Sequence, residues 1–269
     1  MRVEFIKMHG LGNDFVVLDA RARALPDIDS RIAAALANRH TGIGCDQLVL
    51  LEPSASADFR MRIFNHDGGE VGACGNATRA VALLNGSAAR IETIGGMLEA
   101  SPTDGGARVD MGMPRFEWDA IPLAYPMDTI TMPVGWDMLD NPGAVNVGNP
   151  HVIFFVANTE GVPLERLGPE IESDPLFPER VNVNVATIES RNRIRLRVWE
   201  RGAGLTLACG TGACATAVMA MRRRLVDSSV TVALPGGELQ VEWNEGGSIR
   251  MTGPASESFR GSFEWSDYA

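Results

Sequence analysis

The pattern of apolar and polar positions predicts the same order of strands and helices in both halves of the chain. In each half, a short β-rich apolar run follows a Gly-Asn turn, a helical segment and two further strand patterns come next, and a glycine-rich loop then leads into a very apolar helix. These helices are expected at 77–84 and 212–221. Strand-rich halves with one apolar helix each predict an α+β fold of two pseudo-symmetric halves, each a curved, barrel-like sheet around a central helix.

Residue identities support an internal duplication. Residues 61–84 align with residues 196–219 at a constant offset of 135, with seven identities in 24 positions, where chance gives roughly two. The matches include Ala73 with Ala208 and Cys74 with Cys209. Two long copies indicate a duplicated domain, because stacked repeat arrays need three or more short units. We expect an N-terminal half at 1–117, to which the tail 263–269 returns, and a C-terminal half at 118–262.

Composition limits the possible partners and location. The 269 residues are 45% hydrophobic and 22% charged, which is typical of a folded globular protein. The net charge of −10 and a pI near 4.9 argue against nucleic acid or an anionic membrane as a partner. Met1–Gly10 carries charges where a signal peptide needs an apolar run, and no stretch of 18 apolar residues occurs. The expected location is the cytoplasm.

The four cysteines are too few and too scattered for a disulfide framework in that compartment. Cys74 and Cys209 both occupy the duplicated context Ala-Cys-Gly-polar at the start of an apolar helix, whereas Cys45 and Cys214 are expected in the core. Asn76 and Thr211 are good N-cap types, and amides at a helix start lower the pKa of a nearby thiol and bind an anion such as a carboxylate.

This arrangement suggests proton transfer at carbon. If the halves pack about a pseudo-twofold axis, the two helix starts face one pocket, where a thiolate removes a proton from one side of a carbon and a thiol returns one to the other side. Buried structural cysteines and a Cys74–Cys209 redox pair are alternative interpretations. Metal binding is weaker, because Cys209 and Cys214 face different sides of a helix and the histidines, among them His151, form no paired ligand spacing.

Polar residues in the loops are individually less specific. Asn13, Asn65, Asn149 and Asn182 lie in turns or at strand ends, where asparagine is common for conformational reasons alone, but their symmetric placement near the cysteines also fits substrate binding. The adjacent Glu200-Arg201 is either a solvated ion pair or a site for the ammonium and carboxylate of a substrate.

Several sequence runs closely resemble the diaminopimelate epimerase family over nearly the whole chain. They are MHGLGNDFVVLDA (8–20), GIGCDQLVLLE (42–52), FNHDGGEVGACGNATRAVA (64–82), NVGNPHVIF (146–154), FPERVNV (177–183) and ERGAGLTLACGTGACA (200–215). The resemblance implies two α+β halves in a homodimer that interconverts LL- and meso-diaminopimelate without pyridoxal phosphate or metal, on the route to lysine and peptidoglycan. It also implies that Cys74 and Cys209 are the catalytic acid and base.

Other site residues follow from the same resemblance. Gly75-Asn76 and Gly210-Thr211 resemble the backbone cradle of the reacting α-carboxylate, with Asn13 and Gln47 beside it. The non-reacting centre resembles one held by Asn65, Asn149, Asn182, Glu200 and Arg201, and His151 and Glu200 resemble side chains that orient or activate the sulfurs. The chain departs from the family pattern at His66, Gly69, Ala77, Ala80, Asn184 and Leu205. The nearest rival is a proline racemase-like or hydroxyproline epimerase-like enzyme, and a thiol redox protein is a rival from another class.

Overall fold

The computed structural model describes residues 1–72 and 74–268. Ala73, one of the repeated positions, and Ala269, the end of the predicted tail, lie outside the described residues. The chain divides into two compact units, Met1–Val109 with Gly253–Ala269 and Asp110–Thr252.

The first unit is built on a mixed sheet. Its hairpins are antiparallel, but β2 with β3 and β4 with β6 are parallel pairs. Short β5 (Glu70–Val71) also pairs with β4. The strand β8 (Gly106–Asp110) lies at the end of the stretch Met1–Val109 of this unit. In order of pairing the strands are β19 (Ser256–Glu264), β1 (Arg2–Gly10), β2 (Asn13–Asp19), β3 (Gln47–Glu52), β4 (Phe59–Asn65), β6 (Ala89–Thr93) and β7 (Gly96–Thr103).

From β11 to β17, the second unit repeats the pairing order and strand directions that the first unit has from β1 to β7. Here β12 with β13 and β14 with β16 are the parallel pairs, and short β15 (Gly204–Thr206) pairs with β14 as β5 does with β4. The duplication is therefore visible in the topology as well as in the sequence. In order of pairing the strands are β11 (Gly143–Asn146), β12 (Pro150–Phe155), β13 (Asn182–Ser190), β14 (Arg193–Glu200), β16 (Ser229–Leu234), β17 (Gly237–Glu242) and β18 (Arg250–Pro254); β9 (Gly135–Trp136) and β10 (Leu139–Asp140) form a separate hairpin.

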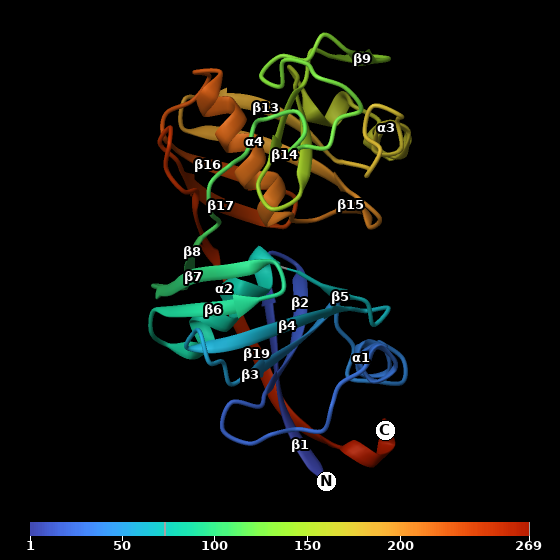
Figure 1. Cartoon of the computed structure of the whole chain (residues 1–269), viewed down its shortest axis with the longest axis vertical. Coiled ribbons are helices and arrows are strands. Elements are labelled where there is room, and N and C mark those ends of the chain that lie inside the picture. Colours follow the sequence, from blue (N-terminus) through green and yellow to red (C-terminus); the bar gives the residue numbers. More distant parts are fainter. Residues whose placement is uncertain (73, 269) are drawn as a thin grey trace. The chain divides into compact units, whose positions relative to one another are not determined.

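One helix lies at the centre of each unit. In the second unit α4 (Gly210–Arg222) packs against six strands, β11 to β14, β16 and β17, and all its residues from Gly212 to Ala220 are buried (Figure 1). A helix that is apolar on every side must be enclosed, and the many alanines let the strands approach it. In the first unit α2 (Gly75–Asn85) contacts β1, β7 and β19. The predicted fold of curved sheets around central helices is confirmed.

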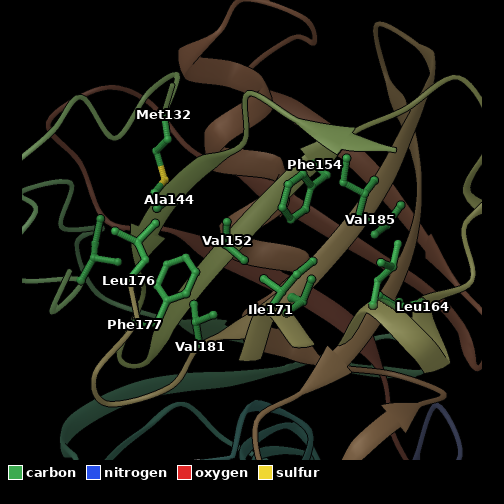
Figure 2. Close-up of a cluster of buried hydrophobic side chains, with 14 of the residues drawn as sticks. Met132, Ala144, Val152, Phe154, Leu164, Ile171, Leu176, Phe177, Val181 and Val185 are labelled. Carbon is green, nitrogen blue, oxygen red and sulfur yellow. The ribbon is translucent and has the colours of Figure 1, made fainter. Parts of the chain in front are cut away.

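The remaining helices cover the other side of each sheet. The first helix, α1 (Ser30–Ala37), contacts β3 and β4, and α3 (Leu164–Glu172) contacts β13, β14 and β15. Figure 2 shows the apolar cluster under α3, in which Ile171 and Leu164 lie near Phe154, Val152 and Val185 of the sheet. Two short 3₁₀ turns, η1 (Thr159–Gly161) and η2 (Trp265–Asp267), complete the elements. Within residues 1–72 and 74–268, every helix is too short or too polar to cross a membrane.

The structural units differ from the predicted halves at both boundaries. Strand β19 pairs with β1 from Arg2 to His9, so residues 253–262 lie in the first unit together with the tail. The exposed side chains from Ser256 to Arg260 give β19 no apolar alternation that would predict its pairing with β1. The segment 110–117 begins the second unit, where Arg115 forms a bridge with Asn146.

The end of α4 carries backbone strain. Arg224 has φ 58°, and the amides of Arg224 and Leu225 donate to the carbonyls of Met221 and Ala220, a Schellman-type ending that usually uses glycine. We expect Arg224→Gly to raise the free energy of unfolding by about 0.5 kcal/mol, because relief of the left-handed strain exceeds the entropy that glycine adds to the unfolded chain. Urea denaturation measures this change.

Helix α2 provides the reciprocal control. Gly86 ends it at φ 71°, and the space that a Cβ would occupy there is open, so Gly86→Ala should lower stability by about 1 kcal/mol through backbone strain alone. A destabilised Arg224→Gly variant would show instead that the arginine side chain contributes more than its backbone conformation costs.

Candidate active site

Cys74 is the N-cap residue of α2 in the first unit. Its backbone is extended (φ −147°, ψ 113°), the helix begins at Gly75, and both Gly75 and Asn76 are buried in the first turn. The Thr78 amide and hydroxyl donate to the Cys74 carbonyl at 2.9 and 2.8 Å. The prediction that Asn76 caps this helix is therefore wrong: the cysteine already has the extended conformation of a cap, and Asn76 is the second helical residue.

Asn13 lies between the Cys74 thiol and the carboxylate of Asp46. Its Nδ2 donates to Asp46 Oδ2 at 2.9 Å, which leaves Oδ1 to accept from Asn76 Nδ2 at 3.4 Å and from Cys74 Sγ at 3.9 Å. Asp46 is held by Arg39 at 2.7 Å. The amide of Asn13 is thus oriented with its carbonyl toward the sulfur.

The neighbouring strands of the first unit carry two further predicted site residues. Gln47 begins β3 opposite Asn65, the last residue of β4, and Gln47 Nε2 donates to Asn65 Oδ1 at 3.0 Å. Gln47 Oε1 is buried and has no hydrogen-bond partner among the described residues. An unpaired buried acceptor is costly, so this end of the strands is suited to a donor from a ligand.

Cys209 occupies the equivalent position in the second unit. It is the N-cap residue of α4, with Gly210 the first helical residue, and its Sγ accepts the Gly212 amide at 3.3 Å and lies 3.4 Å from Thr211 Oγ1. Thr211, like Asn76, is the second helical residue rather than the predicted cap. Cys209 is only 4% exposed.

Glu200 is the acidic neighbour of Cys209. Thr206 Oγ1 donates to Glu200 Oε1 at 2.6 Å, and the Cys209 thiol donates to the same carboxylate. Burial raises the pKa of Glu200, while these two hydrogen bonds act in the opposite direction. Burial and then the Glu200 charge raise the pKa of Cys209 well above its ordinary value.

The expected lowering of this cysteine pKa by the helix start is therefore wrong for Cys209. The Thr211 hydroxyl and the Gly212 amide favour the thiolate, as predicted, but desolvation and the nearby carboxylate outweigh them. Cys209 consequently holds its proton at neutral pH. Its thiol is an acid with a hydrogen-bonded carboxylate beside it.

Asn182 and Arg201 are joined at the ends of neighbouring strands. The Arg201 amide donates to Asn182 Oδ1 at 3.0 Å, and Asn182 Nδ2 donates to the Pro150 carbonyl at 2.8 Å. The Arg201 guanidinium donates to the carbonyl of Glu179 at 2.8 Å. It does so from an exposed position, so Glu200 turns toward the sulfur while Arg201 faces solvent.

His151 is fully buried and bonds to two asparagines. Its Nε2 lies 3.0 Å from Asn149 Oδ1 and its Nδ1 lies 3.0 Å from Asn184 Nδ2. Burial lowers its pKa to about 3. Both ring nitrogens are thus engaged within the second unit, and the ring is neutral, so any effect on a sulfur as a cation is excluded at physiological pH.

Four residues of this chemistry were not anticipated from the sequence. Asp46 and Asn184 hold predicted site residues, Thr206 holds Glu200, and the Gly212 amide holds Cys209. Two of them carried a sequence signal: Asp46 directly precedes Gln47, and Asn184 shares a strand face with Asn182. Thr206 and Gly212 carried no such signal, because the tight β14–β15 turn and the start of α4 bring them to their partners.

The remaining two cysteines lie in the core. Cys45 and Cys214 are buried in the interior, at 1% and 0% exposure, as predicted for core residues. Across the described ranges 1–72 and 74–268, His, Cys, Asp and Glu side chains form no group of three or more that could hold a metal ion. Among the family departures, Ala77 and Ala80 are buried in α2, whereas Leu205 is exposed on β15.

Two solved structures share this fold over nearly the whole chain. A phenazine biosynthesis protein of the PhzF family from Bacillus anthracis superposes with a TM-score of 0.69 at 16% identity, covering 98% of this chain and 99% of its own. A probable proline racemase from Agrobacterium radiobacter K84 superposes with a TM-score of 0.68 at 14% identity, covering 98% and 93%. At these identities the likeness establishes the fold.

Sequence relatives are far closer. The diaminopimelate epimerase of Erythrobacter litoralis is 66% identical over 269 residues and covers 100% of both chains. The diaminopimelate epimerase family matches residues 5–117 and 143–257, which include every candidate site residue described above. With a family match over most of its length and a relative of this identity, the chain belongs to the diaminopimelate epimerase family of isomerases.

Proposed function

We propose that this chain interconverts LL- and meso-2,6-diaminopimelate by moving a proton at one α-carbon between Cys74 and Cys209. The carrying observation is that both units place a cysteine as the N-cap of the central helix, at the same point of the same strand order. A duplicated acid/base site suits inversion of one carbon, because the proton leaves from one face and enters from the other.

The proposed step balances without a cofactor. One cysteine, as thiolate, takes the α-proton, so a C–H bond breaks and an S–H bond forms. The other cysteine, as thiol, gives its proton to the opposite face, so an S–H bond breaks and a C–H bond forms. The raised pKa of Cys209 supports its assignment as the thiol before substrate binds. Cys74 is then the base in the direction that starts from this state. The roles exchange in the reverse direction.

The helix starts supply the electrostatic part of the proposal. Removal of an α-proton puts negative charge on the α-carboxylate, which amides at a helix N-terminus stabilise. We assign the amides of Gly75-Asn76 and Gly210-Thr211 to this cradle, with Asn13 and Gln47 beside it. The orientation of Asn13 by Asp46 and the unpaired Gln47 Oε1 support these two assignments.

The distal, non-reacting centre is assigned to a second group of residues. An ammonium group needs acceptors and a carboxylate needs donors, and amide and guanidinium side chains at the strand ends provide both. The exposed guanidinium of Arg201 and the partly exposed Asn149 support the assignment. The group consists of Asn65, Asn149, Asn182, Glu200 and Arg201.

One incubation tests the substrate and the reaction together. In deuterated water, LL-diaminopimelate should yield the meso isomer with solvent deuterium at a single α-carbon, measured by mass spectrometry and chiral chromatography. L-proline and trans-4-hydroxy-L-proline serve as matched substrates for the related racemase chemistry. Exchange into proline but not diaminopimelate would replace this assignment with the racemase, and no exchange into any of them would leave a protein without epimerase activity.

We further propose that the enzyme acts in the cytoplasm as a homodimer, in the supply of lysine and of the peptidoglycan cross-linking residue. The family resemblance supports this setting, as does the acidic charge of −10, which disfavours association with nucleic acid or anionic membranes. Sedimentation velocity at micromolar concentration tests the assembly. A single species of 28.9 kDa would contradict the dimer.

A further inference from the structure

Asn184 is a fully buried side chain on β13 with two defined partners. Its Nδ2 lies 3.2 Å from the carbonyl oxygen of Val152 and 3.0 Å from Nδ1 of His151. A carbonyl oxygen only accepts hydrogen bonds, so the amide end that faces Val152 must be the NH₂ group. This contact fixes the orientation of the Asn184 amide.

The fixed amide determines the state of His151. The second N–H of Asn184 faces His151 Nδ1, so Nδ1 must be an acceptor and carries no proton. Because burial keeps the imidazole neutral, its single proton lies on Nε2. The Nε2–H group then donates to Asn149 Oδ1 at 3.0 Å.

The hydrogen-bond directions extend to Asn149. Its carbonyl end is occupied by His151, so its NH₂ group is the end left for other partners. Asn149 is partly exposed, directly after Gly148, whose φ of 109° turns the chain at this point. An outward NH₂ group is a donor that suits a carboxylate oxygen.

We propose that Asn184 is a positioning residue that sets which nitrogen of His151 carries the proton, and thereby which end of the Asn149 amide faces the substrate. The three side chains form a directional series of hydrogen bonds from Val152 outward, and donor and acceptor are assigned for each of its three bonds. Asn184 Oδ1 is buried without a hydrogen-bond partner among the described residues. The link to substrate rests on the proposed function, in which Asn149 binds the distal centre.

Asn184 also packs against the helix that carries Cys209. A Cβ placed on Gly212 would lie 2.9 Å from Asn184 Oδ1 and 3.3 Å from Cys209 Cβ. The fully buried Asn184 side chain therefore lies close against the start of α4, where a larger side chain would not fit. Asn184→Asp is therefore the sharpest variant, because it keeps the size and removes the donor. The aspartate would accept a hydrogen bond from Nδ1–H, so that Nε2 carries no proton and accepts from the Asn149 NH₂ group. The Asn149 carbonyl would then face outward, against a carboxylate.

The test combines nitrogen-15 NMR of labelled histidine with steady-state kinetics on the full-length protein. We expect His151 of the unsubstituted protein to be the neutral Nε2–H form at neutral pH, and Asn184→Asp to give the Nδ1–H form. The KM for LL-diaminopimelate should rise about ten- to a hundred-fold with a smaller change in kcat, as expected for losing one hydrogen bond to a charged group.

A matched control separates positioning from general damage. Thr216→Val replaces a buried hydroxyl of α4 that has no hydrogen-bond partner among the described residues, and it should leave the His151 tautomer and the KM unchanged. An Nδ1–H form in the unsubstituted protein, which needs no variant, would overturn the proposal. So would an unchanged tautomer in Asn184→Asp, or a changed tautomer with an unchanged KM. Absence of epimerisation in the unsubstituted protein would refute the proposed function, while the NMR result would still decide the role of Asn184 toward His151.

Discussion

Cys74→Ala and Cys209→Ala should each lower kcat for epimerisation by at least about a thousand-fold, since each removes one of the two proton-transfer groups. The loss should appear in kcat for both LL- and meso-diaminopimelate, because each cysteine serves as base in one direction and as acid in the other. Coupled assays with either isomer as the starting substrate measure it. Alanine leaves no group that could exchange a proton.

Cys45, one of the two core cysteines, provides the comparison for these variants. Cys45 is 1% exposed in the apolar cluster of the first unit, where burial raises the pKa of its thiol to about 11. Cys45→Ala should retain catalysis and lose about 1 kcal/mol of stability through the small cavity. If Cys74→Ala or Cys209→Ala kept full activity while remaining folded, that sulfur would have no part in the reaction.

Glu200→Gln should lower kcat/KM by about a hundred- to a thousand-fold, because it removes the carboxylate that is hydrogen-bonded to the Cys209 thiol. The variant also removes a negative charge next to the sulfur. That charge is the second-largest cause, after burial, of the raised pKa of Cys209. Its removal should lower this pKa and move the alkaline limb of the kcat/KM profile to lower pH. The direction follows because less negative surroundings favour the thiolate.

The pH profile distinguishes this role from a loss of folding. Glu170→Gln changes an exposed carboxylate of α3 and should leave both the rate and the profile unchanged. In a background with Cys45, Cys74 and Cys214 replaced by alanine, the ultraviolet absorbance of the Cys209 thiolate should titrate at lower pH with Glu200→Gln than with Glu200. A titration that moves to higher pH, or does not move, would contradict the electrostatic part of the account.

The duplicated core was predictable from sequence because its signals are local. Alternation and glycine punctuation predict strands at 47–51, 60–64, 181–188 and 193–199, which match β3, β4, β13 and β14 to within two residues at each end. The apolar runs likewise predict the helices α2 and α4. Strand β19 was not predictable in this way, since its side chains from Ser256 to Arg260 are exposed and its identity depends on pairing with β1 at the far end of the chain.

Some features of the candidate site could likewise be predicted from the sequence, and others depend on tertiary contacts. The repeated cysteines, glycines and strand-end asparagines could be read directly, whereas the protonation state of Cys209 could not. The helix start was visible in the sequence, but the burial of the sulfur and the approach of Glu200 arise from the β14–β15 turn. Asn184 appeared only as a departure from the family pattern, and its role depends on the parallel pairing of β12 with β13.

The most direct test of two-base catalysis follows deuterium at the earliest turnovers. LL-diaminopimelate is incubated with the enzyme in deuterated water, and substrate and product are separated and analysed before one-tenth conversion. Two cysteines predict that the meso product carries solvent deuterium at one α-carbon while the recovered LL isomer remains protiated. Product that retains the substrate's own hydrogen at the inverted carbon would show a single base returning it to the other face, and would contradict the account.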